Sequence, residues 1–219
     1  MRCGLFCPHV VGMESLYKYH LKNFYPNGKQ LHHDPLVVLF ENFLSASDAE
    51  EVILQAKDQL VRARVSGAKE VEVSAGRTND LVWLQHNHSP DIQRICRTVA
   101  EVVGLPLALA EAMQVIRYLP GQEYKAHYDA YKQGSQYMEK RGQRLVTALC
   151  YLSNVIDGGE TEFPKLNIKI RAKQGSLLIF NNTYPNTNDV HVNSLHAGCP
   201  VIFGEKWAFN LWFREYTRN

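Results

Sequence analysis

The stretch "KWAFNLWF" (residues 206–213) indicates the fold class, because its side chains alternate between two kinds of surface. Successive side chains of a β-strand point to opposite faces of a sheet, so this stretch forms two separate rows. One row is apolar, and we expect it to pack on helices: Trp207, Phe209, Leu211 and Phe213. The other row carries a charge, a small residue, an amide and an indole, which suits a pocket lining: Lys206, Ala208, Asn210 and Trp212.

Further short apolar segments precede this one in the second half of the chain. Turn sequences rich in glycine and proline separate them, among them "PGQ", "DGGE" and "KQG". Many short strands joined by such turns predict a sandwich or a barrel. The segments span residues 112–119, 123–131, 144–152, 168–172, 175–180 and 193–198.

Two helices are predicted ahead of these strands, after a first strand within residues 36–44. Ser47 and Glu50 form a capping-box pattern at the start of one apolar stripe of helical spacing. Ser89, followed by proline, and Gly104 mark the two ends of a second stripe. The fold class that we expect is α+β, mainly β: a jelly roll flanked on one side by the N-terminal helices.

Composition and charge narrow the function classes. A chain of 219 residues with 45% hydrophobic content suits one globular domain with a sizeable core. The 24 basic and 22 acidic residues leave a net charge of +2, and no basic run stands out. We therefore expect neither a nucleic acid nor a membrane surface as partner, and no apolar stretch has the length of a membrane helix.

The beginning of the chain, "MRCGLFCPHVVGMESLYKYH", is not expected to be a signal peptide. Its short apolar run is broken by Pro8 and His9, and no small-residue cleavage site follows. The five cysteines are odd in number and scattered, which favours free thiols and a cytoplasmic location. Cys3, Cys7 and His9 could bind a metal, but a loose terminal tail is the favoured interpretation.

A candidate metal site begins with His127 and Asp129, which are two residues apart in a predicted strand. At that spacing both side chains point to one face, roughly 7 Å apart along the strand. His191 and His196 are the downstream histidines, and Lys206 follows His196 by ten residues. A His–Asp–His set without a fourth protein ligand is typical of non-haem Fe(II) oxygenases. A nearby lysine could pair with the far carboxylate of a dicarboxylate that chelates the iron.

A rival metal motif is the H-x-H formed by His86 and His88, which is how the metal motif of cupins opens. That motif requires a glutamate four or five residues further on, where this chain has Ile92 and Gln93. A single strand histidine is also more often an ordinary core or surface residue than a ligand. The order of HxD, a later histidine and the lysine is what favours a metal site.

Three stretches together resemble the collagen-type prolyl 4-hydroxylases, especially their short bacterial, single-domain forms. They are "RYLPGQEYKAHYD" (117–129), "RLVTALCYLSNVIDGGETEFPKLN" (144–167) and "LHAGCPVIFGEKW" (195–207). The resemblance extends over residues 36 to 217 and implies a double-stranded β-helix, which is the jelly roll expected above. We therefore divide the chain into an N-terminal extension, 1–35, and a dioxygenase domain, 36–219.

The resemblance also implies roles for individual residues. The Fe(II) ligands would be His127, Asp129 and His196. The C5 carboxylate of 2-oxoglutarate would be held by Lys206, with the hydroxyls of Tyr118 and Thr161. The peptide-substrate pocket would be lined by Arg144 and Trp212, with Tyr124 nearby. Mobile loops are expected beside this pocket at 66–80 and 132–143.

The implied activity is that of an Fe(II)- and 2-oxoglutarate-dependent dioxygenase that uses O₂, with ascorbate as reductant. It would hydroxylate prolyl residues at C4 in a peptide or protein, and a homodimer is a possible assembly. One alternative is a 2-oxoglutarate oxygenase that acts on a free amino acid or other small molecule. A second alternative, a jelly-roll binding module without catalysis, conflicts with the intact triad and Lys206. Collagen and a disulfide-isomerase partner are not implied, because the chain has no room for the separate peptide-binding domain of the large animal enzymes and shows no secretory or retention signal.

Overall fold

The structure is a computed structural model that describes residues 21–63, 65–66, 71–72 and 75–217. Two sequence-based expectations lie outside these residues. The first is the terminal tail with Cys3, Cys7 and His9. The second is part of the predicted 66–80 loop, namely residues 67–70 and 73–74.

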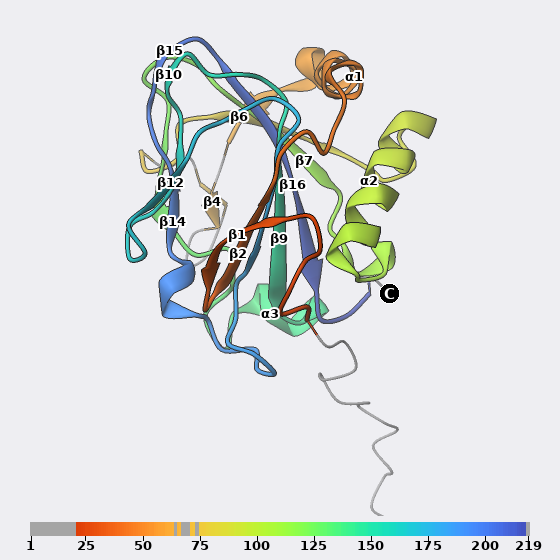
Figure 1. Cartoon of the computed structure of the whole chain (residues 1–219), viewed down its shortest axis with the longest axis vertical. Helices are drawn as coiled ribbons and strands as arrows, with labels where there is room; N and C mark the ends of the chain where they lie inside the picture. Colours follow the sequence, from red (N-terminus) through yellow and green to blue (C-terminus); the bar gives the residue numbers. More distant parts are fainter. Residues whose placement is uncertain (1–20, 64, 67–70, 73–74, 218–219) are drawn as a thin grey trace, which may run out of the picture.

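An eight-stranded antiparallel sheet forms the larger layer of the molecule (Figure 1). The strand order is β1-β2-β13-β9-β16-β7-β6-β3, so β16, the alternating stretch, lies in the middle. The strands are β1 (Lys29–His33), β2 (Leu36–Phe40), β3 (Val61–Arg62), β6 (Asp80–Leu84), β7 (Met113–Tyr118), β9 (Arg144–Tyr151), β13 (Leu177–Asn181) and β16 (Lys206–Arg214).

A four-stranded sheet in the order β12-β11-β14-β8 forms the second layer. Its strands are β8 (Tyr124–His127), β11 (Thr161–Phe163), β12 (Ile168–Ile170) and β14 (His196–Gly198). Two short strand pairs complete the β-structure: β10 (Asp157–Gly158) with β15 (Val201–Phe203), and β4 (Val65–Ser66) with β5 (Val71–Glu72). A cluster of buried apolar residues from both sheets, including Phe163 and Phe180, fills the space between them. This arrangement confirms the predicted jelly roll.

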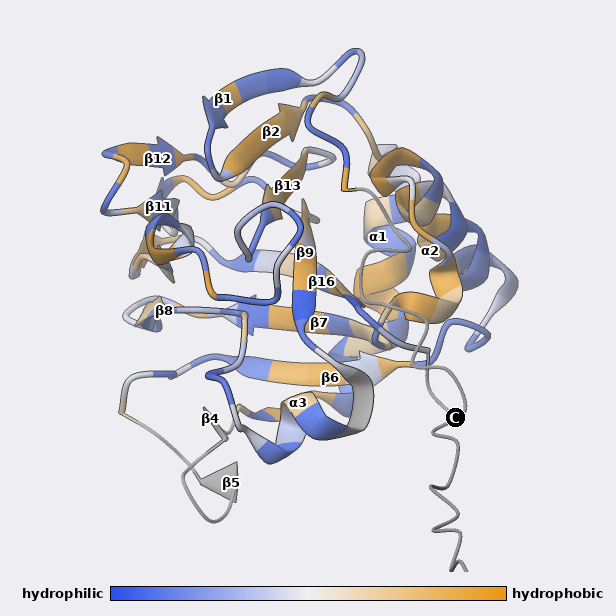
Figure 2. Cartoon of the chain, turned by 90° about the horizontal axis from the view of Figure 1, so that it is seen from below, coloured by the Kyte–Doolittle hydropathy of each residue, from blue (hydrophilic) through white to orange (hydrophobic). Residues whose placement is uncertain are grey.

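Helices α1 (Ala46–Ala56) and α2 (Pro90–Val103) cover the opposite face of the large sheet (Figure 2). The apolar row of β16 packs there as predicted, in one buried cluster with α1 and α2 residues such as Val52 and Ile95. Burying such rows on both faces of the sheet gives the domain two cores, one against the helices and one around the site. Among the described helices, none is long and apolar enough to cross a membrane.

Helix α2 has the ends expected from the sequence, whereas α1 begins earlier. Ser89 caps α2 by accepting a hydrogen bond from the Ile92 N–H, and Gly104 ends it at φ 80°. In α1 the N-cap is Ser45, whose Oγ accepts from the Asp48 N–H at 3.1 Å, so the predicted cap at Ser47 is wrong. The S-x-x-D pattern at 45–48 marks a helix start as well as the S-x-x-E pattern at 47–50 does, so the sequence alone did not separate the two serines.

Two further segments differ from the sequence-based expectation. The 132–143 stretch, expected to be a mobile insertion, contains the short helix α3 (Gln136–Arg141). Strand β1 lies within the segment assigned to the N-terminal extension, and it pairs with β2. The large sheet therefore begins before residue 36. The remaining short helical turns are η1 (Lys57–Gln59), η2 (Leu107–Leu109) and η3 (Val192–Ser194).

Candidate active site

The pairing of β8 with β14 brings together two histidines that are far apart in the sequence. His127 ends β8 and His196 begins β14, and the two residues are direct partners in the antiparallel register. Asp129 follows two residues after His127, beyond the end of the strand, so the expectation that both lie within one strand is wrong in detail. The chain turns after His127 and carries the Asp129 carboxylate in between the two imidazoles.

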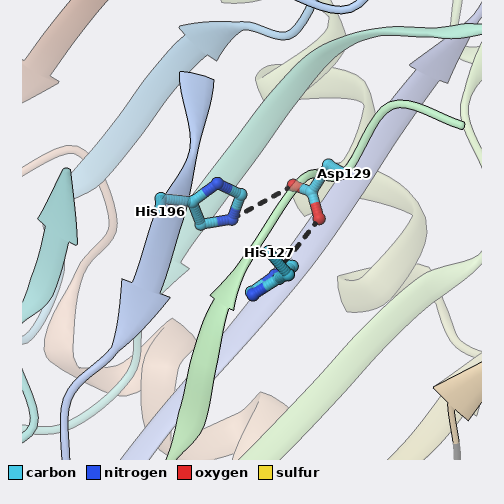
Figure 3. Close-up of side chains that lie close together, drawn as sticks. All are labelled: His127, Asp129 and His196. Atoms are coloured by element: carbon cyan, nitrogen blue, oxygen red, sulfur yellow. Dashed lines mark ion pairs between the residues drawn. The ribbon is translucent and has the colours of Figure 1, made fainter. Parts of the chain in front are cut away.

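The three side chains converge (Figure 3). His127 Nε2 lies 3.6 Å from Asp129 Oδ1, and His196 Nε2 lies 3.6 Å from Asp129 Oδ2. The ligand atoms of the three residues all lie within 4.8 Å of one another, which is the spacing of groups that share one metal ion. Two imidazole nitrogens and one carboxylate suit Fe(II), and their placement on one side leaves the other coordination positions open. The donor set therefore fits a non-haem iron.

Backbone carbonyls fix the orientation of both imidazole rings. His127 Nδ1 lies 2.8 Å from the Lys125 carbonyl oxygen, and His196 Nδ1 lies 2.9 Å from the Ser194 carbonyl oxygen. A carbonyl can only accept, so each Nδ1 carries the proton and each Nε2 keeps its lone pair for a metal. Burial lowers the pKa of His196 to about 4, which keeps that ring neutral at physiological pH.

Asp129 is buried, and a hydroxyl supports its carboxylate. Thr147 on β9 donates a 2.7 Å hydrogen bond to Asp129 Oδ2. Burial alone would raise the pKa of Asp129, but at low pH the protonated forms of His196 and His127 outweigh this effect and hold the pKa far below its usual range. The carboxylate is therefore ionised, as a metal ligand must be.

Lys206, at the start of β16, lies at the inner end of the same pocket. The residue is 2% exposed, and its ammonium makes no hydrogen bond or ion pair with any described residue. Burial lowers its pKa to about 8, because water no longer solvates the charge. Its nearest ring partners are Tyr118 and Tyr151, at 5.4 and 5.6 Å from Nζ. A buried cation without a partner is a site for an anionic ligand group.

Two hydroxyl groups stand beside Lys206. Tyr118 is its direct partner across β7 and β16, and both Tyr118 and Thr161 line the pocket. The hydroxyl of Tyr151 donates to Thr161 Oγ1 at 2.8 Å, so the proton of Thr161 is free for another acceptor. Gly198 also lines the pocket, and a Cβ there would lie 3.4 Å from the Tyr118 hydroxyl.

Tyr124 and Trp212 both line the pocket that contains the metal cluster. The ring of Tyr124 stacks on the His127 imidazole with 3.5 Å between centroids. The guanidinium of Arg77 also lies over the Tyr124 ring, 4.6 Å from its centroid. Trp212 contacts the exposed Trp83 on β6 at 5.8 Å, which extends an aromatic surface outward from the pocket.

Arg144 does not line the pocket but lies behind Trp212, with its guanidinium 3.9 Å from the indole ring. It forms a two-bond pair with Glu111, from Nε at 2.7 Å and Nη2 at 2.8 Å. Arg214 donates to the same carboxylate at 2.8 Å, and also to the carbonyls of Tyr137, at the start of α3, and of Gly142, which follows its end. Arg144 is thus held in one orientation by a buried network.

The other candidate histidines have structural partners. His191 is 1% exposed, and its Nε2 bonds the Asp34 carboxylate at 3.0 Å. His86 Nε2 bonds the Glu111 carbonyl at 2.7 Å. Neither these two nor His88 belongs to a metal-binding group among the described residues.

Several site residues were not identified from the sequence: Arg77, Glu111, Thr147, Tyr151, Asn182 and Arg214. Arg77 falls in the segment interpreted as a loop. The others sit in apolar strands or at strand ends, and their partners are distant: Glu111 and Arg214 are 103 positions apart in the sequence, and Thr147 and Asn182 are 35 positions apart. No local sequence pattern predicts hydrogen bonds between residues that are so far apart in the chain.

Two facing sheets that enclose a His–Asp–His cluster and a buried lysine define a class, the jelly-roll oxygenases with non-haem iron. Comparison with known proteins agrees. The profile of the 2OG-Fe(II) oxygenase superfamily matches residues 113–214. A protein of Acanthamoeba polyphaga mimivirus assigned as a prolyl 4-hydroxylase is 36% identical over 195 residues, which cover 87% of this chain and 78% of that protein. Prolyl 4-hydroxylase 5 of Arabidopsis thaliana is 32% identical, with 84% of this chain and 69% of that protein covered.

A solved structure gives the same result. The viral collagen prolyl hydroxylase from Paramecium Bursaria Chlorella virus-1, in its 2OG complex, matches with a TM-score of 0.67 at 31% identity, covering 81% of this chain and 95% of that one. The chain belongs to the prolyl 4-hydroxylase family of the 2OG-Fe(II) oxygenases. It is a 2-oxoglutarate-dependent dioxygenase, and the resemblance noted from its motifs is confirmed.

Proposed function

We propose that this protein hydroxylates prolyl residues at C4 within peptides or proteins, with iron held by His127, Asp129 and His196. The observation that carries the proposal is the convergence of these three side chains in a pocket that ends at the unpaired Lys206. When bound, Fe(II) with 2-oxoglutarate and O₂ supplies the chemistry, in which oxidative decarboxylation is coupled to hydroxylation of an unactivated carbon.

The protein residues bind and orient the reactants. The ammonium of Lys206 pairs with the C5 carboxylate of 2-oxoglutarate, and the hydroxyls of Tyr118 and Thr161 donate to the same group. Burial of all three excludes water from this end of the pocket and so strengthens their electrostatic interaction with the cosubstrate.

The substrate side is formed by Trp212, Tyr124 and the surface that continues to Trp83. Trp212 is buried with its ring lining the pocket, and its Nε1 finds no acceptor among the described residues. Aromatic surfaces suit proline-rich chains, whose preformed extended helix presents its rings at low entropic cost. Arg144 supports this wall through its stacking on the indole, and three of its N–H donors remain beyond the pair with Glu111.

The test is a hydroxylation assay with Fe(II), 2-oxoglutarate, ascorbate and a panel that contains proline-rich peptides and free proline. We expect mass spectrometry to find one added oxygen on prolyl residues of peptides, with matching succinate production, and none on free proline. Oxygen added to free proline alone would instead identify a small-molecule oxygenase.

Ligand variants separate the metal site from the fold. His127→Ala, Asp129→Ala and His196→Ala should each abolish succinate production. The exposed His88→Ala, from the rival H-x-H pair, is the matched control and should keep wild-type activity. An inactive His88→Ala beside an active His196→Ala would refute the ligand assignment.

A further inference from the structure

The Asp129 carboxylate stands at the end of a chain of buried hydrogen bonds that starts outside the metal cluster. Thr147 Oγ1 lies 2.7 Å from Asp129 Oδ2, and Asn182 Nδ2 lies 2.8 Å from Thr147 Oγ1. The exposed fractions of Asp129, Thr147 and Asn182 are 6%, 1% and 0%, so water does not compete for these bonds.

The direction of both bonds follows from the groups involved. An ionised carboxylate can only accept, so the single hydroxyl proton of Thr147 must point to Asp129. The hydroxyl oxygen then accepts from the amide nitrogen of Asn182. Each of these groups can therefore act only as the donor or acceptor described. The chain of hydrogen bonds holds the Asp129 carboxylate in one rotation about its Cβ–Cγ bond.

The backbone of Asn182 leads to a second member of the cluster. Its carbonyl accepts from the His191 N–H at 2.9 Å, and the His191 carbonyl accepts from the Ser194 N–H at 2.9 Å. The Ser194 carbonyl in turn accepts from His196 Nδ1 at 2.9 Å. The short turn η3 thus carries the position of Asn182 to the imidazole of His196.

We infer that Thr147 and Asn182 are positioning residues for the metal site: the side chain of Asn182 orients Asp129 through Thr147, and its backbone anchors the turn that presents His196. This inference rests on the iron site proposed above. Ligands that are already held in the binding geometry lose less freedom when the ion binds, and outer partners of this kind typically change metal affinity on the order of 10–100-fold.

The test measures Mn(II) binding to the metal-free protein, without 2-oxoglutarate or substrate, by the electron paramagnetic resonance signal of the free ion. Thr147→Val removes the hydroxyl but keeps the shape, and should weaken Mn(II) binding on the order of 10–100-fold. Thr147→Ser keeps the hydroxyl and should bind nearly as the wild type does. Asn182→Ala should weaken binding as well.

Thr183→Val is the matched control, because Thr183 is 1% exposed and its Oγ1 has no partner among the described residues. It should bind Mn(II) as the wild type does. Equal affinities of Thr147→Val and Thr183→Val, or a Thr147→Ser as weak as Thr147→Val, would overturn the inference. A wild-type protein that fails to bind Mn(II) would overturn the proposed metal site instead. Thermal melting of each variant separates loss of affinity from loss of fold.

Discussion

Lys206 combines three properties at the scale of a single residue: a charge, nearly complete burial and no ionic partner among the described residues. Such a group costs free energy in the protein alone, because its hydration is lost without compensation. A dicarboxylate that enters the pocket supplies the missing partner. If Lys206 holds the far carboxylate, as proposed, this cost should favour 2-oxoglutarate over monocarboxylates.

Removal of the Lys206 charge should weaken cosubstrate binding specifically. Lys206→Ala is expected to lose about 2–5 kcal/mol of 2-oxoglutarate binding, because a buried carboxylate is left without its partner. Mn(II) affinity in the absence of 2-oxoglutarate should not change. Titration of both ligands measures this, with the exposed Lys169→Ala as control. An unchanged 2-oxoglutarate affinity in Lys206→Ala would assign the carboxylate to another residue.

The lowered pKa of Lys206 also predicts a dependence on pH. The ammonium is charged below its pKa of about 8 and loses its charge as the pH rises through that value. The KM for 2-oxoglutarate should therefore increase above about pH 8. In Lys206→Arg the guanidinium stays charged, so binding should be weaker overall but independent of pH in this range. Parallel pH profiles of the two proteins would contradict this assignment.

At the scale of the elements, patterns within one strand could be predicted from the sequence, whereas contacts between distant elements could not. The two faces of β16 were predictable because alternation is local. The helix-facing row is found where expected, and so is the pocket-lining row except for Ala208, which packs in the core between the sheets. The metal cluster was recognisable from its motif order. The network of Glu111, Arg144 and Arg214 could not be recognised from the sequence. It joins the segment before β7 to β9, β16 and α3, and only the folded sheet brings these elements together.

Glu111 links these elements, so neutralising it should destabilise the fold in a pH-dependent way. Burial alone would raise the pKa of Glu111, but Arg144 and Arg214 lower it from 4.5 to about 2. Its ionic contribution is present above about pH 4.5 and is lost as the pH falls toward 2. Glu111→Gln leaves two buried guanidinium groups without their counter-charge and should lose about 3–5 kcal/mol at pH 7.

Urea denaturation of the wild type and Glu111→Gln measures this difference. The gap in unfolding free energy should shrink as the pH falls from 4.5 toward 2, since the wild-type carboxyl then becomes neutral too. A gap that is constant with pH would mean that packing, rather than charge, makes the contribution.

At the scale of the whole molecule, the large sheet separates two hydrophobic cores that stabilise different parts of the protein. One core joins the sheet to α1 and α2, which lie on one side of it in Figure 2, and the other lies between the two sheets. In the second core the ring of Phe163 lies 5.6 Å from the His196 imidazole, and the ring of Phe180 lies 4.7 Å from it. Packing in the first core supports the fold, whereas packing in the second also supports the ligands.

This separation predicts different consequences for similar cavities. Ile95→Ala in α2 and Phe163→Ala in β11 both truncate residues that are at most 1% exposed. Each should lower the free energy of unfolding by about 2–5 kcal/mol through lost burial and the cavity that remains. Only Phe163→Ala should also weaken Mn(II) binding, because His196 loses the ring that packs against it. Mn(II) titration well below the melting temperature of each variant tests this. If Ile95→Ala weakens Mn(II) binding as much as Phe163→Ala does, the sheet transmits packing changes to the site and the two cores are not independent.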